Sequence, residues 1–177
     1  DDAAAARRIA EALRASGLRH TILRPNNFYQ NDYWYKDALL QHGVYPQPIG
    51  PVGTSRVDVR DIAEAAALTL LGDGHDGEVY TLVGPEAMTG EATTAAWARA
   101  LGREVVYGGD DMDAWERQAL AILPAWMVFD FRLMYEHFQR HGLMATPEDI
   151  ARQTMLLGHA PRSFDDFARE TAEAWRG

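Results

Sequence analysis

Two patterns of hydrophobic residues alternate along this chain. Short runs of β-branched and apolar residues predict strands, and longer segments with apolar residues at i, i+3 and i+4 predict helices. The predicted strands are 20–24, 56–59, 78–83 and 104–107. The predicted helices are 1–15, 32–41, 61–70, 89–102, 110–123 and 124–141, and two more begin at Thr146 and Ser163. Strands that alternate with helices indicate an α/β fold.

The segment from His20 to Asn31 is the one around which we expect the chain to be organised. Thr21 to Leu23 form an apolar run typical of a strand that is buried on both faces of a parallel sheet. Pro25 ends that strand because it has no N–H group for the ladder. The amide and aromatic side chains that follow would lie at the carboxyl edge of the sheet, where open α/β sheets bind ligands. The alternative is that these residues cap the strand and brace the next helix.

The segment 43–53 contains three prolines and three glycines, which predicts irregular backbone. Such a loop is either a lid or pocket wall, or a plain surface loop. Asp61, at the start of the predicted helix 61–70, is interpreted as its cap, with Asp58 and Arg60 clamping the neighbouring loop.

Composition and charge exclude several classes of function. The 177 residues carry a net charge of −9 with scattered basic residues, so we expect neither a nucleic-acid surface nor a membrane patch. The absence of cysteine excludes disulfides and thiolate chemistry. His137 and His141 stand at i, i+4, which is only half of a zinc site, and no metal is expected. Without a long apolar run or a signal-peptide pattern, we expect a cytoplasmic protein.

Several segments together resemble the NmrA-like family of atypical short-chain dehydrogenase/reductase relatives. They are SGLRHTILRPNNFYQN at 16–31, SRVDVRDIAEAAALTL at 55–70, GEVYTLVGPEAMTGEAT at 77–93, TPEDI, and PRSFDDFARETAEAW at 161–175. The likeness covers nearly the whole chain. It implies an α/β fold, namely the C-terminal half of a doubly wound Rossmann-type parallel sheet with a mostly helical substrate-side cap. Residues 1–109 would form the second half of the NAD(P)-binding domain, and residues 110–177 would form the cap.

The resemblance also implies a cofactor and a site. The cofactor would be NAD(P), with NADP slightly favoured, and Pro25, Asn26, Asn27 and Phe28 would lie beside its nicotinamide. The aromatic residues near this segment predict a pocket for a small hydrophobic carbonyl compound or quinone. The residues assigned to this substrate pocket are Tyr29, Asn31, Trp34, Tyr45 and Trp126.

Two expected features of such a family member are absent from the sequence. The glycine-rich string at 72–77 follows a helix and precedes a strand, the reverse of the order that binds phosphate. Lys36 is the only lysine, and Asp32 rather than tyrosine stands four residues before it. No catalytic residue is therefore assigned. The whole protein would be either an oxidoreductase or a non-catalytic NAD(P)-sensing regulator that binds a protein partner.

The chain by itself is predicted to be inactive and without measurable NAD(P) affinity, because it has no phosphate-binding turn. A helix at its first residues has no sheet centre to cover, so the chain is interpreted as part of a longer protein. The strand at 20–24 would leave an unpaired edge. That edge is expected to pair with a missing N-terminal half or with a second copy of the chain.

Overall fold

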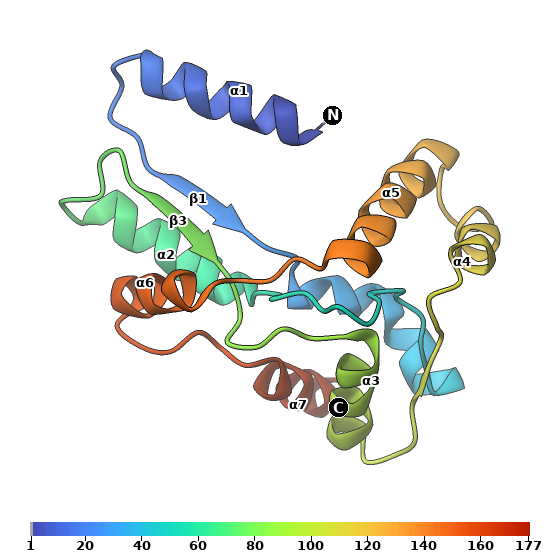
Figure 1. The fold of residues 1–177 in the computed structure, drawn as a ribbon. Helices are drawn as coiled ribbons and strands as arrows, with labels where there is room; N and C mark the ends of the chain where they lie inside the picture. The colour runs from blue at the N-terminus through green and yellow to red at the C-terminus, as the bar shows by residue number, and fades with distance from the viewer. Residues whose placement is uncertain (1) are drawn as a thin grey trace.

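The structure, a computed structural model, describes the backbone of residues 2–177 and the side chains from residue 7 onward. Helices and short parallel strands alternate through its first two thirds, and helices follow to the end (Figure 1). The strands are β1 (Ile22–Pro25), β2 (Val44–Tyr45), β3 (Val79–Leu82) and β4 (Val106–Tyr107). The α-helices are α1 (Asp2–Ala15), α2 (Val59–Leu71), α3 (Gly90–Leu101), α4 (Met112–Ala119), α5 (Ala125–His141), α6 (Pro147–Leu157) and α7 (Phe164–Arg176). Asp1, the first residue of the predicted helix 1–15, lies outside the described residues.

The strands β1 and β3 pair in parallel, with Ile22 opposite Val79 and Pro25 opposite Leu82. The backbone N–H groups of Ile22 and Asn26 donate to β3-side carbonyls at 2.9 and 3.0 Å. Since N–H and C=O of one residue point to the same side in a parallel strand, Leu23 and Pro25 face the other edge. No described strand pairs with that edge. Pro25 is tolerated here because its missing N–H removes nothing from the β1–β3 ladder.

Two predicted elements near the site differ from the structure. The predicted strand 56–59 is wrong, because only Val57 makes an isolated bridge, to Phe28, before Asp58 begins α2 as its N-cap. The segment 43–53 is not irregular throughout, because β2 lies within it and pairs in parallel with β4. This second sheet has only two residues in each strand, too few to give an alternating pattern in the sequence.

The predicted helices 32–41 and 110–123 are also shorter or less regular than expected. The first is a 3₁₀ segment, η1 (Tyr29–Tyr35), followed by a π-type turn, η2 (Ala38–His42). The second ends at Ala119, and Pro124 starts the next helix because it disfavours helical backbone in the residue before it. The predicted N-caps Thr89, Thr146 and Ser163 are confirmed, and each accepts a hydrogen bond from a first-turn backbone N–H.

One face of the β1–β3 sheet carries an apolar cluster. Tyr80 and Leu82 of β3 point towards α2 and α6, where they pack with Ala65 and Leu157. Val79 and Thr81 point to the opposite face of the sheet and are only half-buried. The expectation that β1 is buried on both faces is therefore wrong for this chain, since its first two residues are half-buried and its last two exposed.

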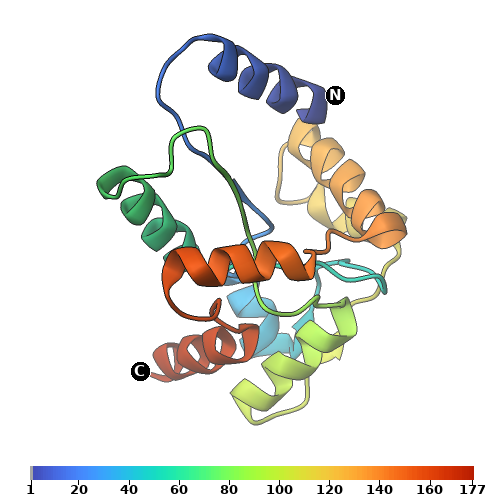
Figure 2. The same cartoon turned by 60° about the vertical axis from the view of Figure 1, so that its left-hand side comes forward.

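The largest core lies between α3, α7 and the η1–β2 region. The rings of Trp97 and Trp175 stack at 5.1 Å with an interplanar angle of 4°, which joins α3 to α7. Phe164, Phe167 and Ala168 form the buried side of α7. Figure 2 shows α6 crossing in front of this core, with α3 and α7 below it.

A third, smaller cluster joins α4 to α5 through Met112, Tyr135 and Phe138. The helices after residue 110 thus serve two regions: α4 and α5 pack on each other, whereas α6 and α7 pack on elements of the first 109 residues. The division into residues 1–109 and 110–177 stays a prediction.

The helix α1 stands apart from these three clusters and is linked to the rest by the connection before β1 (Figure 1). Its Ile9 is 70% exposed, and Ala10 is the residue of its described part that is buried. Among the described residues no helix has the length and apolar character that would be required to span a bilayer.

Candidate functional site

The residues that follow β1 lie at the carboxyl edge of the sheet, as predicted, but they differ in what they offer a ligand. Both polar atoms of the Asn26 amide are engaged: Nδ2 donates to the Leu143 carbonyl at 2.9 Å, and Oδ1 accepts from the Asn27 N–H at 2.7 Å. Asn27 uses its Oδ1 to accept from Arg56 Nε at 3.0 Å. Among the described residues its Nδ2 has no hydrogen-bond partner. Phe28 is 37% exposed.

Below this edge lies a fully buried ion pair between Arg56 and Asp32. Arg56 Nη2 donates to Asp32 Oδ1 at 2.6 Å and to the Phe28 carbonyl at 2.8 Å. Burial opposes the charge on Arg56, but the neighbouring Asp32 carboxylate outweighs it and holds the pKa of Arg56 above its usual range. A buried pair with this many partners fixes the loop after β1 onto the segment before α2.

Two aromatic residues complete the environment of Asp32. Trp97 Nε1 donates to Asp32 Oδ2 at 2.9 Å, and the Tyr45 hydroxyl lies 3.1 Å from Asp32 Oδ1. Nothing in the sequence predicted that Arg56, Asp32 and Trp97 belong to one network. The one signal was the position of Arg56 and Asp58 on either side of Val57 in a predicted strand.

A cavity of about 270 Å³ lies between the loop after β1, η1, the 47–48 region and α5. Its lining consists of Asn27, Asn31, Trp34, Tyr35, Gln47, Phe131, Met134 and Tyr135. The structure therefore brings Asn27, Asn31 and Trp34 of the predicted site together. Its volume is at the small end of ligand pockets, which suits a small ring system.

The other predicted pocket residues lie elsewhere. Tyr29 is buried against Phe164 and Phe167, and its hydroxyl donates to the Arg162 carbonyl at 3.2 Å. Tyr45 is fully buried behind the cavity, where its hydroxyl is used by the ion-pair network. Trp126 is 65% exposed and does not line the cavity. Aromatic character alone could not separate core rings from cavity rings.

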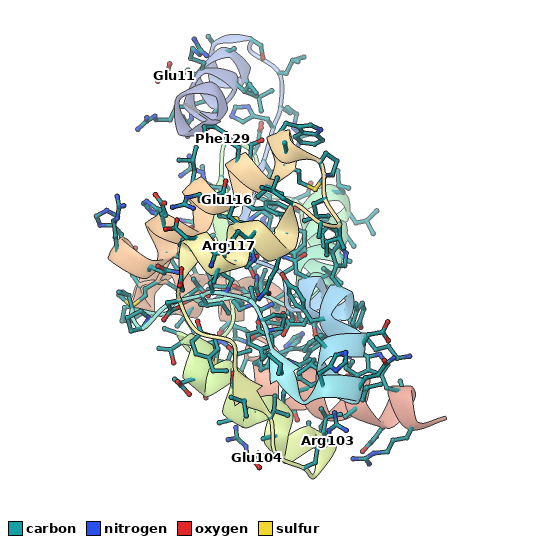
Figure 3. The ribbon with its side chains drawn as sticks, turned by 90° about the vertical axis from the view of Figure 1, so that its right-hand side faces the viewer. Glu11, Arg103, Glu104, Glu116, Arg117 and Phe129 are labelled. Atoms are coloured by element: carbon teal, nitrogen blue, oxygen red, sulfur yellow. The ribbon has the colours of Figure 1, made fainter. Side chains whose placement is uncertain are left out.

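The helix α5 has two unlike faces. Val128, Tyr135 and Phe138 are buried, whereas Trp126, Phe129 and Leu133 are exposed. Figure 3 shows the molecule from the side of α4 and α5, with Phe129 labelled on α5. Met112 of α4 packs on Tyr135 and Phe138, so the apolar residues of α5 are divided between a packed face and an exposed one.

The turn that begins α2 holds two ion pairs with distinct roles. Asp58 is the N-cap and accepts from the Arg60 N–H at 2.9 Å and from Gln30 Nε2 at 3.0 Å. The interpretation of Asp61 as the cap is wrong, because its carboxylate instead accepts from the Arg162 backbone N–H and guanidinium. Asp61 thus joins α2 to the start of α7.

Close to Asp61, the side chains of Glu64 and His159 bring three possible metal-ligand atoms within 4.8 Å of one another. The Arg162 guanidinium contacts both carboxylates and supplies positive charge to them. We therefore read this group as an ion-pair cluster that fastens α2 to the 158–162 loop.

We expect this cluster to give the protein a pH-dependent increment of stability. Hydrogen bonds to the Ala160 carbonyl and to Glu64 raise the pKa of His159, and hydrogen bonds from His159 and Arg162 lower the pKa of Glu64. The His159 contribution is complete below its ordinary pKa and is lost as the pH rises through the raised value. We expect urea unfolding to show a small loss of stability as the pH rises above the ordinary histidine pKa of about 6.5, and this loss should disappear in His159→Gln. The variant His137→Gln should retain that loss; equal curves for wild type and His159→Gln would contradict the assignment.

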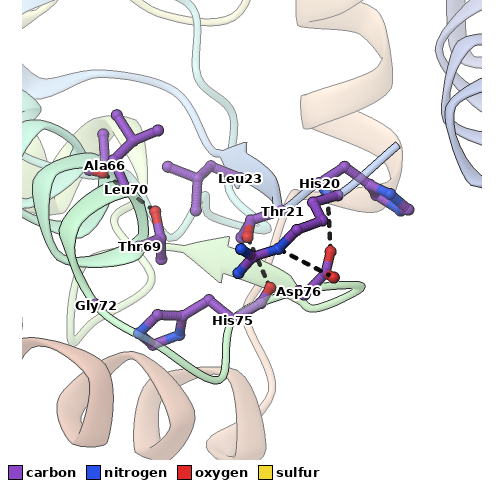
Figure 4. A pocket seen from close by; sticks show the side chains of 10 residues that line it. His20, Thr21, Leu23, Ala66, Thr69, Leu70, Gly72, His75 and Asp76 are labelled. Carbon is purple, nitrogen blue, oxygen red and sulfur yellow. Dashed lines mark hydrogen bonds and ion pairs between the residues drawn. The ribbon is translucent and has the colours of Figure 1, made fainter. Parts of the chain in front are cut away.

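The glycine-rich string at 72–77 lies between α2 and β3, as predicted. It sits at the amino ends of β1 and β3, opposite the candidate site, and has no helix N-terminus after it. Figure 4 shows it on one wall of a cavity of about 470 Å³, where His75 and Asp76 face Thr21 and His20. Leu23, Ala66 and Leu70 form the apolar part of the same cavity. This space adjoins β1, whose outer edge is unpaired.

Parallel strands, helices between them and a cavity at the strands' carboxyl edge define the fold class of this chain. The fold is the Rossmann-like α/β fold of NAD(P)-binding reductases. No protein-family model matches the sequence. Among curated proteins, (4-alkanoyl-5-oxo-2,5-dihydrofuran-3-yl)methyl phosphate reductase of Streptomyces griseus is 33% identical over 165 residues, which are 93% of this chain and 57% of that protein. NAD(P)H azoreductase of Xenophilus azovorans is 27% identical over 93% of this chain and 57% of its own length.

Solved structures give the same result for the fold. The NADPH-dependent quinone oxidoreductase QOR2 of Escherichia coli superposes with a TM-score of 0.79 at 24% identity, over 94% of this chain and 58% of that one. The Citrobacter triphenylmethane reductase complexed with NADP(H) gives 0.75 at 20% identity, over 92% and 56%. The chain thus spans a little over half the length of the relatives that it matches.

Proposed function

We propose that this chain forms the substrate side of an NAD(P)H-dependent oxidoreductase that reduces a small aromatic carbonyl compound or quinone. The observation that carries the proposal is the cavity beside the carboxyl edge of β1, with aromatic walls and neutral polar groups. The reductases among its relatives support the redox chemistry, and the small cavity supports a compact ring as acceptor.

The residues after β1 fit a nicotinamide in part. Asn27 Nδ2 is available to donate to the carboxamide oxygen, and Phe28 is exposed enough to shield the ring from water. Asn26 offers less, because its Nδ2 already donates to the Leu143 carbonyl and its Oδ1 already accepts from the Asn27 N–H, which leaves one Nδ2 hydrogen for a ligand. Bound NAD(P)H would supply the hydride. The residues of this chain would orient the acceptor against the nicotinamide and exclude water.

The remaining part of the dinucleotide-binding fold would come from polypeptide outside these 177 residues and would dock on the open edge of β1. Three features of the chain support this. The backbone of Leu23 is unpaired among the described strands, the cavity of about 470 Å³ adjoins β1, and Leu70, which lines that cavity, is exposed. A second copy of the chain is the other occupant that the edge could take.

The test is to purify this chain together with the polypeptide that precedes it in its gene and to follow NADPH and NADH oxidation with 1,4-naphthoquinone. We expect turnover by the larger protein, with NADPH preferred, and none by the 177 residues alone. In the active protein Trp34→Ala should raise the KM for the quinone by about two- to tenfold, because one aromatic wall is lost. The matched variant Trp126→Ala, which lies outside the cavity, should leave KM unchanged.

A non-catalytic NAD(P)-sensing regulator is the second candidate, and the exposed face of α5 favours it. Trp126, Phe129 and Leu133 would then bind a protein partner. Tight NADPH binding by the larger protein without oxidation by any quinone or aromatic aldehyde would contradict the oxidoreductase and favour the regulator.

A further inference from the structure

The floor of the 270 Å³ cavity carries a pair of tyrosine hydroxyls contributed by two distant parts of the chain. Tyr35 belongs to η1 and Tyr135 to α5, and their hydroxyl oxygens lie 3.4 Å apart. Both residues line the cavity, next to the rings of Trp34 and Phe131. In the ribbon of Figure 1 these elements meet where the start of the light-blue segment passes below α5. The pair is therefore placed within reach of a ligand in this cavity.

Gln47 fixes the direction of one of these hydroxyls. Its Nε2 donates to the Tyr135 oxygen at 3.2 Å, and its Oε1 accepts from the Tyr45 hydroxyl at 2.6 Å. Gln47 is buried, and both ends of its amide are occupied. Because the Tyr135 oxygen already accepts from Gln47, its proton is directed either to Tyr35 or into the cavity.

The orientation of Gln47 follows in turn from the buried ion pair. Arg56 Nη1 donates to the Tyr45 oxygen at 3.3 Å, so the Tyr45 proton is directed away from Arg56 and towards Gln47 or Asp32. The 2.6 Å contact to Gln47 Oε1 is the shorter of the two. A series of hydrogen bonds thus runs from Arg56 through Tyr45 and Gln47 to Tyr135 at the cavity. In this series Arg56 donates to Tyr45, Tyr45 donates to Gln47, and Gln47 donates to Tyr135.

In this series of hydrogen bonds, one of the two hydroxyl protons of Tyr35 and Tyr135 has no acceptor in the part of the chain that the structure describes. If Tyr135 donates to Tyr35, the Tyr35 proton has no partner among the described residues; if Tyr35 donates to Tyr135, the Tyr135 proton has none. Burial is the largest cause that raises the pKa of each of these two tyrosines, so both stay protonated at neutral pH. No charged side chain lines this cavity. A neutral hydrogen-bond acceptor is the ligand group that such a site takes.

We propose that the Tyr35–Tyr135 hydroxyl pair donates a hydrogen bond to the carbonyl oxygen of a flat aromatic ligand that packs against Trp34 and Phe131. This assignment deepens the proposed function, from which it takes the carbonyl class of ligand. The hydroxyl pair binds the oxygen, and the apolar surface of the two rings, whose centroids lie 6.4 Å apart, binds the apolar part. Tyr45 and Gln47 are positioning residues, since they act only through Tyr135.

The test compares two probes of the same shape on the chain itself, without NAD(P)H. Binding of 1,4-naphthoquinone and of naphthalene, which lacks both carbonyls, is measured by equilibrium dialysis. The chain has no cysteine, so the quinone has no thiol to alkylate. We expect the wild-type protein to prefer naphthoquinone by about fivefold, the effect of one neutral hydrogen bond. The double variant Tyr35→Phe/Tyr135→Phe should lose that preference and keep its affinity for naphthalene.

Tyr33→Phe is the matched control, because Tyr33 lies on the same η1 segment but packs on Phe167 and Trp175 outside the cavity. It should keep the preference for naphthoquinone. An independent readout is the infrared carbonyl band of bound naphthoquinone, which a hydrogen bond lowers in frequency. We expect the lowered band in wild type and Tyr33→Phe and not in the double variant. If the double variant does not fold, the wild-type band still decides the question.

Three results would overturn the inference: equal affinity of wild type for both probes, a preference that survives in the double variant, or an unshifted carbonyl band. Failure of the proposed function looks different. If the chain prefers naphthoquinone but the larger protein does not oxidise NADPH, the assignment of the hydroxyl pair stands and the proposed oxidoreductase function is contradicted. If the larger protein oxidises NADPH but the chain shows no preference for naphthoquinone, the function stands and the assignment of the hydroxyl pair is contradicted.

Discussion

Arg56→Met is expected to lower the free energy of unfolding by about 3–5 kcal/mol, because it leaves the Asp32 carboxylate buried without its counter-charge. Asp32 would keep the Trp97 donor, and the Tyr45 hydroxyl at 3.1 Å could turn its proton to Asp32, but both of these groups are neutral. Methionine fills a similar volume, so the loss would report charge rather than packing. Urea denaturation with an unchanged m-value is the measurement.

The control for this prediction is Arg99→Met. Arg99 and Asp165 form a pair at 2.7 Å, close to the 2.6 Å of the Arg56–Asp32 pair, but their side chains are 62% and 64% exposed. We expect a change of about 0–1 kcal/mol there. The double variant Arg56→Met/Asp32→Asn should lose less than the sum of the two single variants, since it removes both charges. Additive losses would show that the two residues are not coupled.

Trp97→Ala is expected to cost about 3–5 kcal/mol of unfolding free energy, the range for removing a fully buried large aromatic side chain. The substitution removes the stack on Trp175, the edge contacts with Phe164 and Phe167, and the hydrogen bond to Asp32. The resulting cavity would lie between α3 and α7, whose mutual packing is the most extensive of any helix pair in the described structure.

Two further variants separate the causes. Trp97→Phe keeps most of the packing and loses only the donor to a charged acceptor, so we expect about 1.5–3 kcal/mol. Trp126→Ala removes the same side chain from an exposed position and should change stability by no more than about 0.5 kcal/mol. Similar losses in Trp97→Ala and Trp126→Ala would contradict the placement of the core.

Those parts of the fold that depend on neighbouring residues could be predicted from the sequence. Thr89, Thr146 and Ser163 each bind a backbone N–H within three residues, so a cap can be recognised in a short segment. The strands β1 and β3 contain apolar runs bounded by turn residues, and the parallel pairing of the two follows from the helix between them.

Features made by distant residues could not be predicted in this way. Arg56 looks like a surface residue until Asp32 and the Phe28 carbonyl are brought to it by the loop after β1. The two-residue strand β2 has no pattern of its own, whereas β4 lies within the predicted strand 104–107. The pairing of β2 with β4 joins distant residues and could not be predicted.

The sequence predicted that the candidate site lies at the carboxyl edge of the sheet, but it did not predict most of the residues that line the cavity. Asn27, Asn31 and Trp34 follow the strand directly, so their position could be inferred from the end of β1. Tyr35, Gln47 and Tyr135 reach the same cavity from three separate elements, and only the folded chain brings them together. Tyr45 and Trp126 show the reverse, because composition cannot tell a ring inside the core from one in solvent.

Pro25 at the open edge of β1 has one consequence for how this sheet can grow. A strand recruited alongside β1 finds hydrogen-bonding groups at Leu23 but no N–H at Pro25. The Pro25 carbonyl can still accept, but the added ladder loses its N–H donor one residue before Asn26. Pro25 therefore separates the part of β1 that can pair with another strand from the loop that reaches the cavity. Another polypeptide can extend the sheet beside β1 without taking the loop after Pro25 into the ladder.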